Sequence, residues 1–276
     1  MTFVILFDVG VMHRLNRQVR FSVNPFEESQ TGYNSYASKP CGSGLSFFLA
    51  LWVELAGELD ADTGFVVNVS RIDQAVRDRA IPVFDAAIRR AAGQGRGLCL
   101  EELCELLRSA WGAVHQAFAE LRLERLGLEL NPYRTLCVNA EDSDMYYFSE
   151  KFEFAAMHRL WNADFDATAN TEMFGKCANP AGHGHNYVIE VTVAKQAVPE
   201  PADWLARFER VVEESFLAMV DHKNLNVDVP GFESLNPTVE NLASFAWSKL
   251  AGRFEDCRLV KVTVWENDRT YCAYSE

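Results

Sequence analysis

The stretch GKCANPAGHGHNYVIEVTVAK, from Gly175 to Lys195, joins a glycine-punctuated turn to an apolar-rich segment. The turn followed by apolar residues predicts a β-strand that enters from a tight loop. His183 and His185 stand two residues apart where the apolar segment begins, so on a strand both imidazoles lie on the same face. The stretch therefore predicts a strand that carries a pair of converging histidines.

The two halves of the chain share motifs in the same order. Four motifs of the first half recur in the second half. VGVMHRLNR (Val9 to Arg17) matches FAAMHRLWN (Phe154 to Asn162), and KPCGSGLSFFLALWVEL matches NPAGHGHNYVIEVTVAK. LCLEELCELLRSAW then matches PTVENLASFAWSKL, and PYRTLCV matches NDRTYCA. These matches predict a tandem duplication, each half running strand, turn, strand, helix, helix, strand, strand, which is an α+β unit built on antiparallel hairpins. The polar tract NAEDSD (139–144) marks the join, giving domains at 1–142 and 143–276.

Composition and charge exclude several classes of protein. The formal net charge of −13 argues against a nucleic-acid partner, which would need a basic face. The longest apolar stretch, LSFFLALWV, is far shorter than the roughly 20 residues of a membrane-spanning helix. The N-terminus has no basic leader typical of a signal peptide, and the seven cysteines lack the spacing of a disulfide framework. A protein with reduced thiols in the cytoplasm, bound to no membrane, is predicted.

A third histidine completes a candidate metal site. His158 ends the strand that precedes His183 and His185, and an antiparallel hairpin would bring it across from them. Three neutral imidazoles leave one zinc position open, as in catalytic zinc sites. An isolated pair of this kind on a strand is more often a polar surface pair. The repeat weakens that alternative, because the first half has Ser43 and Leu45 at the paired positions while it keeps His13.

Three further motifs supply candidate catalytic groups. Cys177 lies in a polar loop shortly before the histidine pair, although a lone cysteine is usually a small buried apolar residue. Asp221 and His222 are adjacent, so the carboxylate can orient the imidazole, although helix ends often carry such a pair by chance. Glu266 lies near the end of an apolar strand, where a carboxylate needs a partner, and its counterpart by the shared Arg-Thr pair is Asn131.

GKCANPAGHGHNY, DHKNLNVDVPGF, PTVENLA and VTVWEND, in this order, resemble the 6-pyruvoyl-tetrahydropterin synthase family over roughly residues 145–276. DADTGFVVNV (Asp60 to Val69) in the first half is similar to another family segment, which the second half lacks. The resemblance implies two tandem tunnelling-fold (T-fold) domains with antiparallel sheets and paired helices that assemble into a barrel. The first domain would be a degenerate copy without a site.

The resemblance also assigns roles to individual residues. It implies that zinc, one ion per chain, is held by His158, His183 and His185. Cys177 would be the general base with Asp221 and His222 as its relay. Glu266 would bind the pterin ring, and Thr238 would line the same pocket.

The reaction that the resemblance implies is that of a carbon–oxygen lyase acting on phosphates. Zinc-dependent conversion of 7,8-dihydroneopterin triphosphate to 6-pyruvoyl-tetrahydropterin would eliminate triphosphate. Mg²⁺ could accompany the substrate as an ion bound to its triphosphate. The five residues between Cys177 and His183 resemble this branch rather than the 6-carboxytetrahydropterin synthases, which usually have a shorter gap. That activity, a pterin aldolase activity at the same zinc site, and a non-catalytic pterin-binding scaffold remain open alternatives. The small-molecule pterin would be the ligand of a homo-oligomer, in which three two-domain chains would supply six units.

Overall fold

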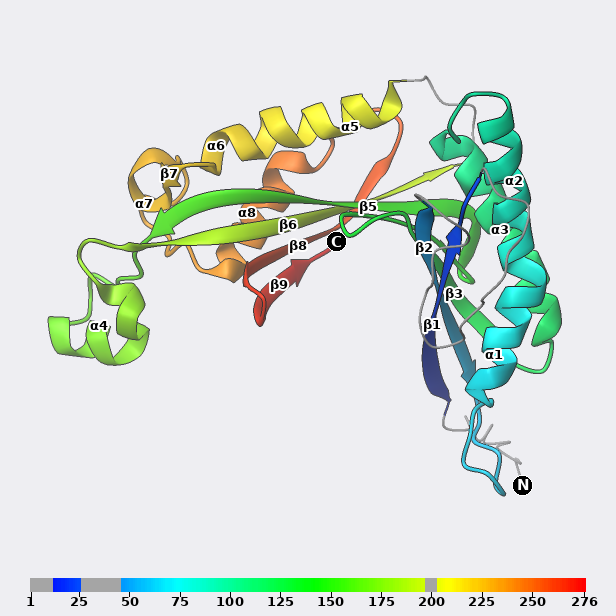
Figure 1. Cartoon of the computed structure of the whole chain (residues 1–276). Coiled ribbons are helices and arrows are strands. Elements are labelled where there is room, and N and C mark those ends of the chain that lie inside the picture. Colours follow the sequence, from blue (N-terminus) through cyan, green and yellow to red (C-terminus); the bar gives the residue numbers. More distant parts are fainter. Residues whose placement is uncertain (1–11, 26–45, 197–202) are drawn as a thin grey trace, which may run out of the picture. The chain divides into compact units, whose positions relative to one another are not determined.

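The computed structural model describes residues 12–25, 46–196 and 203–276 of the chain (Figure 1). The chain divides into two compact units, Met1–Tyr146 and Tyr147–Glu276, and the boundary falls inside strand β5 (Asp142–His158). Each unit combines an antiparallel sheet with helices. Among the described residues, none of the helices is both long and apolar enough to cross a membrane.

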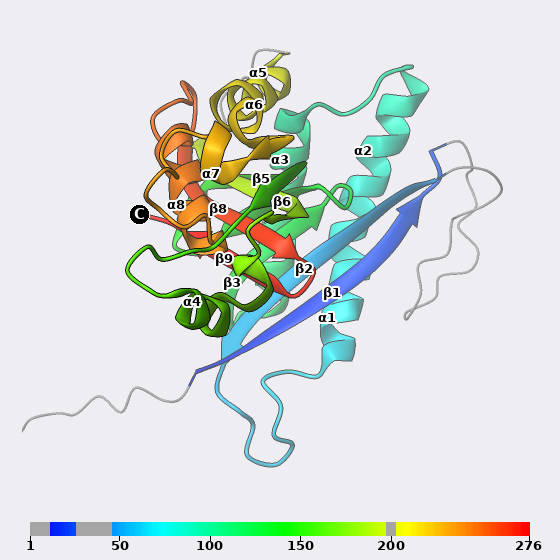
Figure 2. The ribbon, with the colours of Figure 1, turned by 90° about the vertical axis from the view of Figure 1, so that its left-hand side faces the viewer.

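In the described part of the first unit, strands β1 to β4 are neighbours in sequential order and are covered by a helical layer (Figure 2). Its elements are β1 (His13–Val23), β2 (Phe47–Gly57), α1 (Val69–Ala75), a π-helical turn η1 (Val76–Ala80), α2 (Ile81–Gly93), α3 (Leu100–Ala117), β3 (Arg122–Glu129) and β4 (Arg134–Asn139). Alternate residues of β2 face the helices and are buried, among them Leu51, Val53 and Leu55. The predicted strand and helix order of this half is confirmed.

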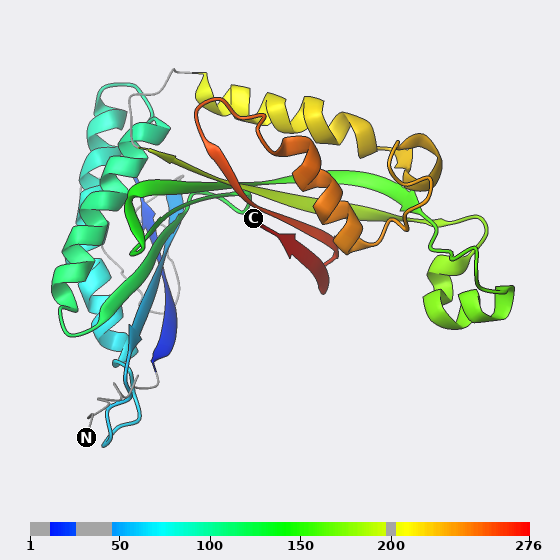
Figure 3. The same cartoon turned by 180° about the vertical axis from the view of Figure 1, so that it is seen from behind.

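The second unit has the strand order β5-β6-β8-β9, with the short strand β7 parallel to β5. Its elements after β5 are α4 (Ala167–Phe174), a 3₁₀ turn η2 (Gly175–Ala178), β6 (His183–Gln196), α5 (Trp204–Val212), a π-helical turn η3 (Glu213–Leu217), α6 (Ala218–Val220), β7 (Lys223–Asn224), α7 (Leu225–Asp228), α8 (Val239–Leu250), β8 (Arg258–Asn267) and β9 (Thr270–Tyr274). Helices α5, α6 and α8 lie along one face of its strands (Figure 3). The short elements α4, β7 and α7 were not expected from the sequence.

The two units share irregularities at matching places. The ladder between β2 and β3 shifts its register at Glu54/Leu55, and the ladder between β6 and β8 shifts at Thr192/Val193. A π-helical turn, which is rare in proteins, interrupts the first long helical segment of each unit, as η1 and as η3. Each unit therefore repeats the same departures from ideal geometry.

The strand registers correct the residue equivalences that the sequence motifs predicted. His13 begins β1, whereas His158 ends β5, so these two histidines occupy opposite ends of their strands and are not counterparts. The pairs flanking the two register shifts, Glu54–Arg125 and Thr192–Lys261, provide a common reference. Counted from them, Leu130 rather than Asn131 stands at the position of Glu266.

The same count places Phe47 at the position of His185. The sequence motif predicted Leu45 at this position, two residues earlier in the chain. Ser43 and Leu45 themselves lie outside the described residues. Phe47 is 57% exposed at the start of β2, so an apolar side chain stands where the second unit has an imidazole.

Candidate metal-binding active site

The candidate site continues the buried face of the second unit beyond the end of its core. Along β6, Val193, Val191, Ile189 and Tyr187 face the helices and are buried, and the next two residues in this row are His185 and His183. On β5 the row of Phe154 and Ala156 ends at His158, and on β8 the row of Val262 and Val264 ends at Glu266. The alternation of strands thus brings the four polar side chains to one end of the core.

The three histidines form a compact triangle. The ring centroids of His158, His183 and His185 lie 4.7, 4.8 and 5.0 Å apart in pairs. Nε2 of His158 is 3.0 Å from Nε2 of His183. Zinc–nitrogen bonds of about 2.0–2.1 Å in a tetrahedral site place the ligand nitrogens about 3.3 Å apart. The ring nitrogens of His158 and His183 therefore lie at a separation that suits one ion, and the ring of His185 lies beside both.

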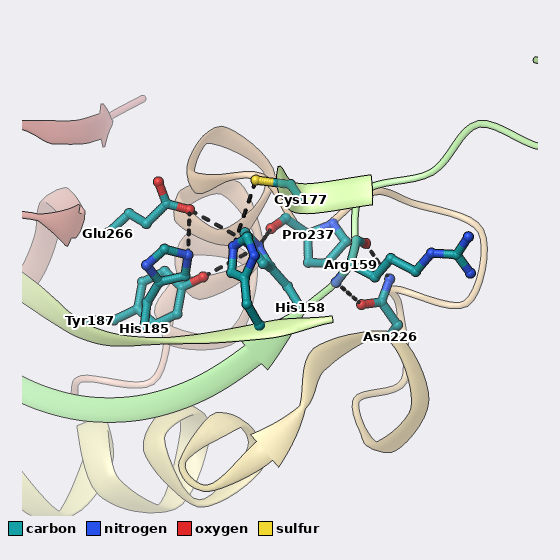
Figure 4. A network of polar contacts seen from close by, with 9 residues as sticks. His158, Arg159, Cys177, His185, Tyr187, Asn226, Pro237 and Glu266 are labelled. Carbon is teal, nitrogen blue, oxygen red and sulfur yellow. Dashed lines mark hydrogen bonds and ion pairs between the residues drawn. The ribbon is translucent and has the colours of Figure 1, made fainter. Parts of the chain in front are cut away.

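The orientation of His158 is set by contacts on the far side of its ring (Figure 4). Its Nδ1 lies 2.9 Å from the carbonyl oxygen of Pro237, to which it donates, and 3.4 Å from the hydroxyl of Tyr187. The proton on Nδ1 leaves the lone pair of Nε2 directed at the other two histidines. A carbonyl that fixes the tautomer in this way is typical of metal-ligating histidines.

His185 offers a second observation that fits a metal ion. Its Nε2 is buried and has no hydrogen-bond partner in the described part of the chain. The nearest carboxylate oxygen, on Glu266, is 3.5 Å away, and the same oxygen lies 3.7 Å from Nε2 of His158. A buried ring nitrogen without a partner is costly, and coordination would satisfy it. The donor set fits zinc, which binds imidazole, thiolate and carboxylate.

Cys177 lies at the rim of the histidine triangle (Figure 4). Its Sγ is 3.7 Å from Nε2 of His183, and its carbonyl accepts a hydrogen bond of 2.8 Å from the amide of Leu160, which anchors η2 beside the end of β5. Burial, and then the negative charge of Glu266, raise the pKa of the Cys177 thiol. These surroundings disfavour the thiolate, and a cation nearby would oppose that effect.

The side chains of Asp221 and His222 contact each other. Nδ1 of His222 is 2.9 Å from Oδ2 of Asp221, as the motif predicted. The His222 side chain is 81% exposed, and its φ of 55° is unusual for a residue with a side chain. Among the contacts of the described residues, none joins this pair to Cys177, so the relay role remains a prediction.

Thr238 has a structural role in this chain. It is the N-cap of α8, and its side-chain oxygen accepts a hydrogen bond of 3.3 Å from the amide of Asn241. The predicted role in substrate binding stays a prediction.

Sequence reasoning missed the residues that support the ligands. Tyr187 ends the GHGHNY motif, stacks on Phe154 at 5.0 Å, and packs edge-on against the ring of His185. Its period-2 spacing from the two histidines was the available signal. The carbonyl of Pro237 carried no signal, because a backbone acceptor is invisible in the sequence.

Burial of two neutral histidines predicts an acid-sensitive fold. The pKa of His158 and that of His185 are lowered, chiefly because burial disfavours the charged imidazolium. The unfolded chain then binds more protons, so the stability of the metal-free protein should fall as the pH drops below the ordinary imidazole pKa of about 6.5. Thermal unfolding of the metal-free protein between pH 8 and 5 measures this. The double variant His158→Asn, His185→Asn should have a flatter profile, and an equally steep profile in that variant would contradict the assignment.

His158, Cys177 and His183 form one group of side chains that could hold a metal ion, and His158, His185 and Glu266 form a second that shares His158. Such donor sets at the end of an antiparallel sheet are typical of metal-dependent enzymes. The sequence model of the family "6-pyruvoyl tetrahydropterin synthase" matches residues 147–276. The chain is 38% identical over 128 residues to the 6-pyruvoyl tetrahydrobiopterin synthase of Homo sapiens, a match that covers 46% of this chain and 88% of the human protein. The chain belongs to the 6-pyruvoyl tetrahydropterin synthase family.

Two further similarities concern the same family and a related enzyme. A 6-carboxy-5,6,7,8-tetrahydropterin synthase of Aquifex aeolicus is 28% identical over 159 residues, covering 46% of this chain and 96% of the relative. The solved structure of Caenorhabditis elegans 6-pyruvoyl tetrahydropterin synthase is 32% identical, covers 48% of this chain and 96% of that chain, and superposes with a TM-score of 0.44.

Proposed function

We propose that the chain converts 7,8-dihydroneopterin triphosphate to 6-pyruvoyl-tetrahydropterin with elimination of triphosphate, and that it requires zinc. The observation that carries the proposal is the meeting of His158, His183 and His185 with Cys177 and Glu266 at one end of the core. The name of the human relative, together with its 38% identity, supports a 6-pyruvoyl pterin as the product. The reaction makes the chain a carbon–oxygen lyase that acts on a phosphate ester.

Each residue of the cluster has a chemical task in this proposal. The three histidines hold zinc through nitrogens whose neutral form is favoured by burial. When bound, zinc supplies Lewis acidity and a positive charge that favours the thiolate of Cys177. Cys177 then takes a proton from a side-chain carbon of the substrate. The carboxylate of Glu266 accepts hydrogen bonds from the N–H edge of the pterin ring and so fixes its orientation.

A second candidate function is 6-carboxytetrahydropterin synthesis at the same site. The similarity to the Aquifex aeolicus protein, at 28% identity, supports this second candidate. The two activities use the same substrate class and differ in the product. Product identity therefore separates them, whereas triphosphate release alone does not.

The test is incubation of the purified, zinc-loaded protein with 7,8-dihydroneopterin triphosphate. We expect triphosphate release together with 6-pyruvoyl-tetrahydropterin, and loss of both after chelation of the metal. Release with a 6-carboxy product would support the second candidate. Absence of triphosphate release from a zinc-loaded, folded protein would contradict both and favour a pterin-binding scaffold.

We further infer that the two units arose by tandem duplication, with the first a degenerate T-fold domain (1–142) and the second the catalytic one (143–276). The matched register shifts and the matched π-helical turns support this, because such irregularities rarely coincide by chance. Phe47 and Leu130 stand at the positions of His185 and Glu266. The first unit thus lacks the ligand pattern.

The order of the strands supports an assembly of several chains. Strands β1 and β9 end the strand orders of their units, and edge strands need pairing or cover. We infer a homo-oligomer, a trimer of two-domain chains, in which these edges pair to close a barrel. We also propose that the substrate triphosphate carries Mg²⁺. The proposed location of the protein is the cytoplasm.

A further inference from the structure

The segment from Asp221 to Asn226 covers the end of strand β5, which carries His158. At its start, Oδ1 of Asp221 accepts a hydrogen bond of 2.9 Å from the amide of Ala155, and the amide of His222 donates one of 2.6 Å to the carbonyl of Ala155. Strand β7 then pairs Lys223 and Asn224 with the next two residues of β5. The backbone of β5 is thereby fixed up to the residue before His158.

Asn226 makes the second attachment, directly after His158 (Figure 4). Its Oδ1 accepts a hydrogen bond of 2.7 Å from the amide of Arg159, and its Nδ2 donates one of 2.9 Å to the carbonyl of Arg159. The side chain of Arg159 points away from the histidines and lies over the ring of Trp161, 4.1 Å from its centroid. Asn226 therefore holds Arg159 through its backbone alone.

We propose that Asn226 is a positioning residue that fixes the metal ligand His158, an inference that rests on the proposed metal site. His158 ends β5 and is 1% exposed, with Nδ1 on Pro237 and Nε2 facing the cluster. A small backbone movement after His158 would misalign both ring nitrogens together. The pair of hydrogen bonds from the Asn226 side chain to the Arg159 backbone, here called the clamp, opposes this movement on one side. The contacts at Ala155 oppose it on the other.

An asparagine is required by the chemistry of the clamp. Its amide offers one acceptor and one donor, which match the N–H and the carbonyl of the same residue. Aspartate at this position keeps the acceptor but faces the carbonyl of Arg159 with a second acceptor. Alanine removes both contacts and leaves two polar backbone groups without their partners.

The chain contains a matched control. Asn170 makes the same clamp on Asn162, because its Oδ1 accepts a hydrogen bond of 2.7 Å from the Asn162 amide and its Nδ2 donates one of 2.9 Å to the Asn162 carbonyl. Asn170 is fully buried in α4, so its loss should destabilise the fold at least as much. The residue it holds is not adjacent to a metal ligand.

The experiment compares Asn226→Ala, Asn226→Asp and Asn170→Ala in the full chain. Zinc affinity is measured by competition with a chelator, the visible spectrum of the Co²⁺-substituted protein reports the ligand geometry, and thermal unfolding reports the fold. Because changes behind a ligand typically cost 10–100-fold in metal affinity, we expect Asn226→Ala to bind zinc about 10-fold or more weakly with an altered Co²⁺ spectrum. Asn226→Asp should fall between this variant and the wild type. Asn170→Ala should lower the unfolding temperature while it retains the affinity and the spectrum.

The outcomes separate this inference from the proposed function. If the wild type binds zinc and both Asn226 variants keep its affinity and Co²⁺ spectrum, the positioning role is overturned and the metal site stands. Equal losses of affinity in Asn226→Ala and Asn170→Ala would also overturn it, because they would indicate a general effect on the fold. A wild type without zinc affinity would overturn the metal site together with the role of Asn226.

Discussion

Replacing Cys177 with alanine should lower the turnover of 7,8-dihydroneopterin triphosphate by about 10²–10⁴-fold, the usual effect of removing a general base. The thiol lies 3.7 Å from Nε2 of His183, at the rim of the triangle and not between the ligand nitrogens. Its removal leaves the three imidazoles and the carboxylate of Glu266 in place. Zinc content and pterin affinity should therefore change little while turnover falls.

The measurement combines single-turnover kinetics, metal analysis and equilibrium binding of the pterin. Cys257→Ala is the matched control, because burial raises the pKa of that thiol to about 12 and it lies beside Asp256 near the start of β8. The control should retain the wild-type rate. A Cys177→Ala variant that turns over at nearly the wild-type rate would move the base to another group, and one that loses its zinc would make the thiol a ligand.

The sequence predicted the order of the strands and long helices because period-2 and period-3.6 apolar patterns persist through them. β6 and α8 are examples in the second unit. The same patterns could not predict α4, β7 and α7, which are short and held by side-chain contacts. Asp166 caps α4 through the amide of Ala169, and Asn224 caps α7 through the amide of Asn226. Such contacts depend on which neighbours the fold supplies.

The composition of the site was more predictable than its supports. His158 and Glu266 each end a row of alternating apolar residues, and His185 and His183 together end the row on β6, so strand periodicity brings the four to one face. The carbonyl of Pro237 and the backbone clamp by Asn226 involve main-chain atoms, which every residue has. A sequence therefore shows the ligands but not the groups that orient them.

The equivalence of the two halves shows where motif matching misleads. The recurring MHRL placed His13 opposite His158, yet strand register puts the two at opposite ends of β1 and β5. A match of four letters carries no information about position along a strand, whereas a register shift fixes every later pair. The shared shifts at Glu54 and Thr192 are for this reason the stronger support for the duplication.

A large effect on zinc binding is expected when one of the three histidines is removed. His183→Ala should reduce the zinc content from about one ion per chain to a small fraction, since a site with three protein ligands that loses one keeps only two imidazoles. The loss of affinity should exceed the roughly 10–100-fold typical of changes behind the ligands. Turnover should fall with the metal.

His13→Ala is the control for this experiment, because His13 is exposed at the start of β1 and belongs to none of the candidate metal groups among the described residues. It should keep one zinc ion per chain and the wild-type rate. The thiol of Cys177, in the same candidate group as His158 and His183, is the group best placed to replace the missing imidazole. Metal analysis of His183→Ala, alone and combined with Cys177→Ala, tests for that replacement. Full zinc content in the double variant would show that the ion is bound elsewhere in the chain. Two tightly held ions in the wild type would contradict the prediction of one zinc ion per chain.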